Sequence, residues 1–275
     1  MDVFAAFIAP ALAGVFVGVM SGLLGVGGGT IMVPIFRLAF GMSPLASTAT
    51  SLFAIIPTSI SGVVAHTRAK TCVPKLGLAL GVGGAVMSPV GVWLASVSPG
   101  WLVICVAAVV IGFSAFKMFK KAVKCAPTPR AGASFAYSAT PKPVPDQPVL
   151  SRKQYLQGAC IGLVAGLASG YVGVGGGFIM VPLMLAILDI PMSLASGTSL
   201  IAIMILAIPG VIEQGLLGNI DYLAGIAIVV GSIPGALVGA RLVRVVPERQ
   251  LRFIFGGFLL VAAVMLMLNE FGILG

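Results

Sequence analysis

Residues 21–34 read SGLLGVGGGTIMVP, and residues 169–182 repeat the pattern as SGYVGVGGGFIMVP. The same offset of 148 positions aligns Thr50-Ser51-Leu52 with Thr198-Ser199-Leu200. A constant offset over such a length indicates two copies of one structural unit rather than two short motifs. A duplicated unit with a run of glycines inside an apolar segment is typical of membrane transporters.

Composition places the chain in a membrane. Hydrophobic residues make up 59% of its 275 residues, charged residues only 8%, and the mean hydropathy is +1.15. Soluble domains carry about a quarter charged residues, so the sequence predicts an all-α integral membrane protein. The net charge of +9 comes from short basic stretches beside apolar runs, which indicates membrane loops and not a nucleic-acid surface.

Apolar segments of spanning length occur three times in each half. A helix needs about 20 apolar residues to cross the hydrocarbon core. The candidates are residues 45–65, 74–96, 100–118, 194–214, 222–242 and 252–271. Each half also opens with a longer apolar stretch, 4–40 or 155–188, that carries the glycine run in its middle. We expect each of these to be a hairpin of two short helices, which makes eight to ten membrane segments in total.

A segment rich in proline and basic residues separates the two halves. Residues 119–153 contain six prolines and seven lysines or arginines against a single acid, Asp146. Such a composition predicts a flexible linker, and the positive-inside rule places it in the cytoplasm. The predicted organisation is therefore a first membrane repeat at 1–118, this linker, and a second repeat at 154–275.

Loop charges predict that the two repeats insert upside down relative to each other. The 66–75 loop holds Arg68, Lys70 and Lys75, whereas its counterpart at 213–221 holds two acids and no base. The next loop shows the opposite difference in charge. The 97–100 turn is uncharged, whereas the equivalent region of the second half carries four arginines. Under the positive-inside rule, these patterns indicate inverted repeats with both termini outside the cytoplasmic membrane.

The glycine run has the composition of an anion site. A helix that starts after the run would point its free amides, with about half a positive charge, at the break. Glycines let a ligand approach the backbone closely. We therefore name Gly27, Gly28 and Gly29, together with Gly175, Gly176 and Gly177, as candidate substrate-binding residues. The alternative is that these glycines serve only close helix packing.

Hydroxyl side chains near the breaks form a second candidate group. Its members are Ser21, Thr50, Ser51, Ser169, Thr198 and Ser199. Hydroxyls donate hydrogen bonds to oxyanions without adding a competing charge. The alternative for the threonines and for Ser51 and Ser199 is ordinary capping of the helices that follow the breaks.

Other chemistry has little support in the sequence. The four cysteines show no CxxC spacing and His66 has no acid or cysteine at ligand spacing, so no metal site, cofactor or disulfide is expected. No nucleotide-binding loop and no nucleophile–base set is present. We therefore expect a protein that is not an enzyme. Its partners would be the lipid bilayer and a small anionic substrate, with the oligomeric state left open.

The two glycine-containing segments and the following TATSL and SGTSL strings resemble the sulfite exporter TauE/SafE family, also called the 4-toluene sulfonate uptake permease family. The resemblance covers essentially the whole chain outside 119–153. It implies a permease for sulfite, a sulfonate, sulfoacetate or a related sulfur-containing anion. The first copy reads SPLASTATSL where the second reads PMSLASGTSL, which leaves open whether the two halves play equal roles.

Energetics favour export. An inside-negative potential drives anions outward by about 2.3 kcal/mol per charge per 100 mV, so an exporter needs no coupling ion. Uptake would require one, and the sequence shows no site for it. The alternatives are an anion channel of the same fold, an uptake permease for another small organic anion, and a membrane scaffold that transports nothing.

Overall fold

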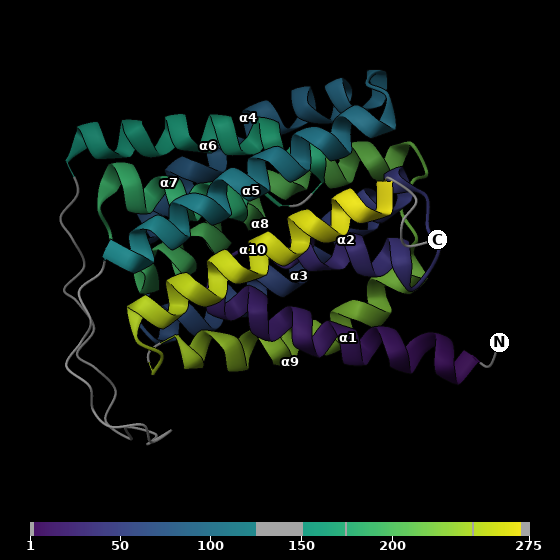
Figure 1. Cartoon of the computed structure of the whole chain (residues 1–275), viewed down its shortest axis with the longest axis horizontal. Coiled ribbons are helices and arrows are strands. Elements are labelled where there is room, and N and C mark those ends of the chain that lie inside the picture. Colours follow the sequence, from purple (N-terminus) through teal and green to yellow (C-terminus); the bar gives the residue numbers. More distant parts are fainter. Residues whose placement is uncertain (1–2, 125–150, 174, 244, 271–275) are drawn as a thin grey trace.

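The computed structural model describes residues 3–124, 151–173, 175–243 and 245–270 (Figure 1). Within these ranges every regular element is helical. The helices are α1 (Val3–Leu24), α2 (Gly29–Leu38), α3 (Pro44–Arg68), α4 (Pro74–Val97), α5 (Gly100–Lys124), α6 (Arg152–Val172), α7 (Gly177–Leu183), a π-helical turn η1 (Met184–Leu188), α8 (Met192–Leu216), α9 (Tyr222–Leu242) and α10 (Glu248–Glu270). Five of them, α3, α4, α6, α8 and α9, are long and apolar enough to cross a membrane.

The prediction of an all-α membrane protein is confirmed. Each of the six predicted spans corresponds to one helix, and each long opening stretch is a hairpin of a long helix and a short one. A helix of ten residues such as α2 is about 15 Å long, half of the hydrocarbon thickness. The second arm of the first hairpin therefore re-enters and does not cross.

The outer surface of the bundle has the character of a lipid-facing one. Large apolar side chains on α4, α5, α9 and α10 are exposed, among them Val86, Phe113 and Val230. Trp93 and Trp101 are also exposed, where α4 ends and α5 begins. Tryptophans favour the membrane–water interface, so this end of the bundle fits a membrane surface.

Helices of one half pack mainly on helices of the other (Figure 1). α1 lies along α9, and α6, its equivalent in the second half, lies along α4. Both pairs run parallel: on α1, Gly14 lies against Ile228 and Gly22 against Ala236. The first helix of each half thus packs on a helix of the other half, and α4 and α9 occupy equivalent places in the two halves.

Glycines explain how closely these pairs approach. Gly14, Gly18 and Gly22 of α1 face α9, where Gly231 and Gly235 face α1 in return. A methyl group at Gly231 would overlap the carbonyl oxygen of Ala11. Small residues four apart let two helix backbones come into contact, which is a main source of stability between membrane helices. These glycines therefore serve close helix packing.

The centre of the bundle is the pair α3 and α8, which occupy equivalent places in the two halves. Gly62 of α3 lies against Leu200 of α8, and Gly210 of α8 lies near Leu52 of α3. Rising numbers on one helix thus meet falling numbers on the other, so the pair is antiparallel. A two-fold axis relating the halves would then lie across the helices, as inverted repeats require. The placement of the repeats in a bilayer stays a prediction.

The two ends of the described chain and the connection between its two halves lie at opposite ends of the bundle. The start of α1 and the end of α10 share one end, while the end of α5 and the start of α6 share the other (Figure 1). α5 continues to Lys124, beyond the predicted linker boundary, and α6 begins at Arg152. The remainder of the predicted linker, residues 125–150, lies outside the described residues.

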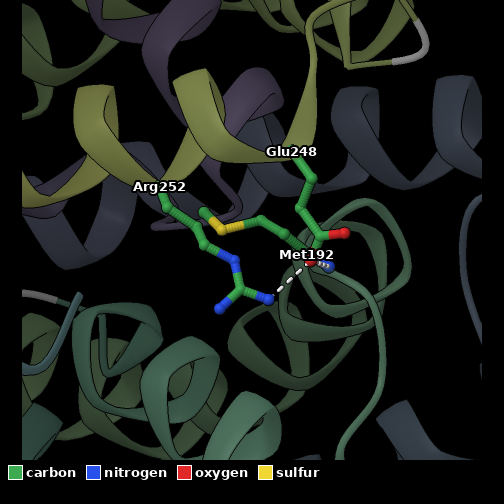
Figure 2. A network of polar contacts seen from close by, with 3 residues as sticks. All are labelled: Met192, Glu248 and Arg252. Carbon is green, nitrogen blue, oxygen red and sulfur yellow. Dashed lines mark hydrogen bonds and ion pairs between the residues drawn. The ribbon is translucent and has the colours of Figure 1, made fainter. Parts of the chain in front are cut away.

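Glu248 of α10 forms an ion pair within its own helix and a hydrogen bond to the start of α8 (Figure 2). Glu248 Oε1 accepts a hydrogen bond of 2.6 Å from Arg252 Nη2 and one of 3.2 Å from the Met192 backbone N–H. The carboxylate thus satisfies a first-turn amide of α8 and lies at the positive end of its dipole.

Candidate functional site

The first glycine run forms a sharp break between α1 and α2. Gly25, Gly27 and Gly28 all have positive φ, of 70°, 80° and 85°. Side chains other than glycine rarely adopt this conformation, which explains why the break consists of glycines. Gly28 is the N-cap of α2, and Gly29 is its first residue, so the predicted half-helix starts at the predicted place.

The second run has the same geometry. Gly173, Gly175 and Gly176 have φ of 73°, 83° and 69°. Gly176 is the N-cap of α7, which begins at Gly177. Together with η1, this arm continues to Leu188. Both breaks therefore present the start of a returning helix. The Ile31 and Ile179 N–H groups already donate to the N-cap carbonyls of Gly28 and Gly176, and the Gly177 N–H donates to the Gly175 carbonyl, so only part of each first turn is open to a ligand.

The fold brings the two breaks together. A methyl group placed on Gly177 would lie 2.6 Å from the carbonyl oxygen of Gly25 and 2.8 Å from the Cα of Val26. Segments that are far apart in the sequence therefore touch inside the bundle, and all residues of both breaks that have a described burial are buried. The two predicted glycine groups belong to a single site.

Two isoleucines fill the space beside both breaks. A methyl group on Gly27 would lie 2.9 Å from Ile203 Cγ2 and 3.4 Å from Ile55 Cγ2. One on Gly175 would lie 2.9 Å from Ile55 Cδ1 and 3.7 Å from Ile203 Cγ2. Both isoleucines are fully buried. They occupy equivalent positions on α3 and α8, so the break region is closed in this conformation by one side chain from each half.

Two serines hold the breaks in place. Ser199 Oγ, on α8, donates a hydrogen bond of 2.6 Å to the carbonyl of Gly25 in the first break. Ser51 Oγ, on α3, donates one of 2.9 Å to the carbonyl of Gly173 in the second. A carbonyl freed by a helix break in a membrane needs such a partner. Each half thus supports the break of the other.

The threonines beside these serines support a different element. The backbone N–H of Asp221 donates to Thr50 Oγ1 at 3.0 Å, and that of Val73 donates to Thr198 Oγ1 at 3.0 Å. Asp221 and Val73 are the N-cap residues of α9 and α4. Each threonine therefore anchors the start of a helix from the opposite half.

The alternative that these hydroxyls cap their own helices is wrong. α3 begins at Pro44 and is capped by Ser43, whose Oγ accepts from the Ala46 N–H at 3.2 Å. The cap of α8 is Pro191. Thr50, Ser51 and their equivalents lie inside the helices, because the proline-led first turn begins earlier than the hydroxyl pattern suggested.

Five buried hydroxyls have no hydrogen-bond partner among the described residues. Two of them, Ser59 and Ser88, belong to neither break, and the other three flank the breaks. These three are Ser21 Oγ and Ser169 Oγ, at equivalent places before the two breaks, and Thr30 Oγ1 in the first turn of α2. Ser21 and Ser169 lie beside the N-cap glycines: methyl groups at Gly28 and Gly176 would be 3.7 and 3.3 Å from their Cβ atoms. Buried hydroxyls are normally paired, so these three are available to a ligand.

The sequence alone did not single out Ile55, Ile203 or Thr30. The isoleucines had a signal, since Ile55 and Ile203 are separated by the offset that aligns the repeats. In a chain so rich in aliphatic residues, however, one matching pair does not stand out. Thr30 had no such signal, because its equivalent in the second half is Phe178.

Of two described cavities, one lies away from the breaks and the other reaches Thr30 in the first turn of α2. One of about 510 Å³ opens between α4, α5, α6 and α7, and only Ser114 and Tyr171 add polar atoms to its apolar lining. Another of about 210 Å³ lies beside α2 and α10. Such linings suit hydrocarbon and not a small anion.

These features define a multi-pass membrane protein with two glycine-broken hairpins that meet in its interior. The sulfite exporter TauE/SafE family matches residues 10–266. The chain therefore belongs to this family, whose members are membrane transporters. It follows that the chain lies in a lipid bilayer and acts on a small-molecule substrate.

Related proteins have been described in bacteria and archaea. The chain is 27% identical over 246 residues to the probable membrane transporter protein YunE of Bacillus subtilis, covering 86% of this chain and 89% of that protein. It is 28% identical to the probable membrane transporter protein YdhB of the same organism, with the same coverage. Identity to the probable membrane transporter protein MJ0441 of Methanocaldococcus jannaschii is 24%, over 94% of each chain. No solved structure matches the chain.

Proposed function

We propose that the protein is a secondary transporter that moves a small sulfur-containing anion, of the sulfite, sulfonate or sulfoacetate type, out of the cell across the cytoplasmic membrane. The description of the family as sulfite exporters supports this substrate class. The anionic character is supported by one observation: the two breaks from which α2 and α7 start touch in the interior, and the unpaired hydroxyls of Ser21 and Ser169 lie beside their N-cap glycines.

The anion would bind between the two breaks. The first-turn amides of α2 and α7 carry partial positive charge, and Ser21 and Ser169 hold unpaired hydroxyls beside the N-cap glycines. Ser51, Ser199, Thr50 and Thr198 have protein partners, so we assign them to positioning the breaks and α4 and α9.

Transport would alternate between two closed arrangements around this site. The buried Ile55 and Ile203 contact both breaks, so one or both must move for an anion to enter. We place the central linker and the 66–75 loop in the cytoplasm and both termini outside, with the repeats inverted. The antiparallel α3–α8 pair supports this arrangement.

Flux measured in proteoliposomes tests the proposal. Purified protein should carry sulfite or a sulfonate such as sulfoacetate, with saturation and counterflow. Flux without saturation or counterflow would indicate a channel instead. Absence of flux for every sulfur anion tested would contradict the proposal.

Two kinds of variant test the site. Gly28→Val and Gly176→Val should abolish flux, whereas Gly112→Val, where a side chain meets open space, should not. Ser21→Ala and Ser169→Ala remove hydroxyls that have no protein partner, so folding should be unaffected. Each should raise KM by about tenfold, since a hydrogen bond to a charged group contributes about 1.5–3 kcal/mol. Unchanged KM in both serine variants would place the anion elsewhere.

A further inference from the structure

His66, the only histidine of the chain, lies in the interior beside the first break. Its side chain is fully buried near the end of α3, and both ring nitrogens have partners. Nε2 donates to the carbonyl of Gly22 at 2.8 Å, because a carbonyl can only accept. Nδ1 lies 2.7 Å from Thr71 Oγ1. Gly22 follows Ser21 directly, so the imidazole is bonded to the helix that leads into the break.

The turn after α3 positions Thr71 over the ring. Lys70 has φ 55°, and the Thr71 N–H donates to the His66 carbonyl at 2.9 Å. This is the Schellman arrangement that ends many helices. The second half ends α8 in the same way, where the Asn219 N–H donates to the Gln214 carbonyl at 3.1 Å.

The second half therefore holds a non-ionisable version of the same pair. Asn219 Nδ2 donates to Gln214 Oε1 at 2.8 Å, and Gln214 is buried as His66 is. Gln214 and Asn219 stand at the positions equivalent to His66 and Thr71. A glutamine–asparagine pair would suffice for a purely structural bond, so the histidine adds an ability that only one half possesses.

That ability is to bind a proton without losing a hydrogen bond. In the neutral ring, Thr71 donates to Nδ1. In the protonated ring, Nδ1–H donates to Thr71 Oγ1, and the hydroxyl turns to the His66 carbonyl, 3.3 Å away. A hydroxyl both donates and accepts, so each protonation state is fully bonded.

Neither ring nitrogen bonds a carboxylate. At the start of α8, which lies beside the ring, Asp189 precedes the helix and Glu248 is already bonded to Arg252 and to the Met192 N–H. The ionisable groups on the elements around it are Arg68 and Lys70 at its own helix end, Cys72 and Lys75 just beyond, and Arg241 at the end of α9. The described residues of α1, α3, α4 and α9 contain no carboxylate, and α8 contains one only at Glu213, near its far end. A buried charge needs a counter-ion.

We propose that His66 is a proton-binding site whose occupancy strengthens binding of an anion at the first break. The inference rests on the proposed transport function. The anion supplies the missing counter-charge, and the bond to Gly22 links the ring to the helix that carries Ser21. By linkage, an anion that favours the proton is itself favoured by it, and the factor is the same in both directions.

Nuclear magnetic resonance on a single labelled histidine tests the site directly. Protein with isotope-labelled histidine and without a histidine tag gives one imidazole signal. It should show the Nε2–H tautomer at high pH and titrate reversibly between about pH 4 and 8. Sulfoacetate, whose sulfonate group stays ionised over this range, should move the midpoint upward. A ring that keeps one protonation state throughout, or a midpoint that sulfoacetate does not move, overturns the proposal.

Transplanting the pair from the second half tests the coupling. The double variant His66→Gln with Thr71→Asn keeps a buried hydrogen-bonded pair and removes the proton site. In the unaltered protein, sulfoacetate affinity should rise on the order of tenfold on acidification, a size typical of coupling between sites. The double variant should bind at all pH values with the lower affinity. An unchanged pH profile in the double variant overturns the proposal.

The two proposals fail in different ways. A protein that carries no sulfur anion, yet shows a titrating imidazole, keeps the proton site and loses both the transport function and the coupling. A protein that transports with the same pH profile in the double variant loses only the role of His66. A variant with Gln214→Ala, which alters the non-ionisable pair, should leave the pH profile unchanged.

Discussion

Ser51 and Ser199 illustrate how much a single hydroxyl does in this membrane interior. Each donates to a carbonyl of the opposite break, and lipid offers no substitute for such a donor. A residue chosen as a ligand candidate from its type and position is thus already committed to the protein. Ser21 and Ser169, which lie beside the N-cap glycines and have no partner, are the serines at the breaks that remain for a substrate.

Removing the hydroxyl of Ser51 or of Ser199 should destabilise the fold. Ser51→Ala and Ser199→Ala each leave a buried carbonyl without its side-chain donor, which costs about 1–3 kcal/mol. Thermal unfolding in detergent should show a lower Tm for both. Ser96→Ala, at an exposed serine bonded only within its own helix, is the control and should change Tm little. Equal Tm values for all three variants would contradict the assigned role.

Ile55 and Ile203 should act as the barrier of the closed site. Shortening both to alanine removes the side chains that contact the two breaks, so we expect a leak of small anions without saturation. Each substitution should also cost about 2–5 kcal/mol of stability. The matched control is Ile111→Ala, an equally buried isoleucine on α5, which should lose stability without any leak. A leak of the same size in the control would show that loss of stability, and not loss of a barrier, is responsible.

At the scale of elements, the ends of α3 and α8 share one turn but differ in the residue at its left-handed position. Lys70 has φ 55° and its equivalent Gly218 has φ 71°. A side chain in this conformation is strained by roughly 1–2 kcal/mol. The first half tolerates that strain, whereas the second half avoids it with glycine.

Exchanging the residue should shift stability in opposite directions in the two halves. Lys70→Gly should raise the free energy of unfolding by roughly 1 kcal/mol, because it removes the strain. Gly218→Ala should lower it by a similar amount, since a side chain there meets no other atoms and only the backbone conformation is affected. Denaturant unfolding in detergent measures both, and a stabilising Gly218→Ala would contradict the argument.

At the scale of the whole molecule, stability comes from the packing of helices of one half against helices of the other. α1 lies on α9, α6 on α4 and α3 on α8, so neither half can bury its glycine-rich faces alone. The same packing between the halves brings the two breaks into contact. A site shared by two halves can open toward one side when the halves shift against each other.

Single cysteines at equivalent turns test the inverted arrangement. Lys70→Cys and Gly218→Cys replace exposed residues in the two matching turns, in protein whose own four cysteines are replaced. A membrane-impermeant maleimide added to intact cells should label Gly218→Cys from outside and Lys70→Cys only after lysis. Labelling of both from one side would rule out inverted repeats.

Cys72 of the unaltered protein should itself react slowly with a maleimide. It is buried in the turn after α3, where burial raises the pKa of its thiol while a bond to Thr67 lowers it, burial being the larger effect. A thiol with a raised pKa stays protonated at neutral pH and reacts slowly. Unaltered protein should therefore show slow maleimide labelling at Cys72, and the rate should increase as pH rises.

Much of the architecture could be predicted from residue patterns. Spans, hairpins and the two breaks follow from apolar segment length and from glycine, because lipid forces every backbone group into a helix wherever it can form one. The start of α2 at Gly29 and of α7 at Gly177 follows for the same reason. The repeat offset also paired each element with its counterpart.

Partners across the interior could not be predicted in this way. That Ser199 bonds Gly25, that Ile55 and Ile203 lie beside both breaks, and that His66 reaches Gly22 depends on which helices pack together. Local sequence sets whether a segment is helical, because that depends on nearby backbone bonding and hydrophobicity. Packing between distant helices depends on surfaces that exist only after those helices have formed, so the tertiary structure alone determined which hydroxyls are used by the protein and which stay available.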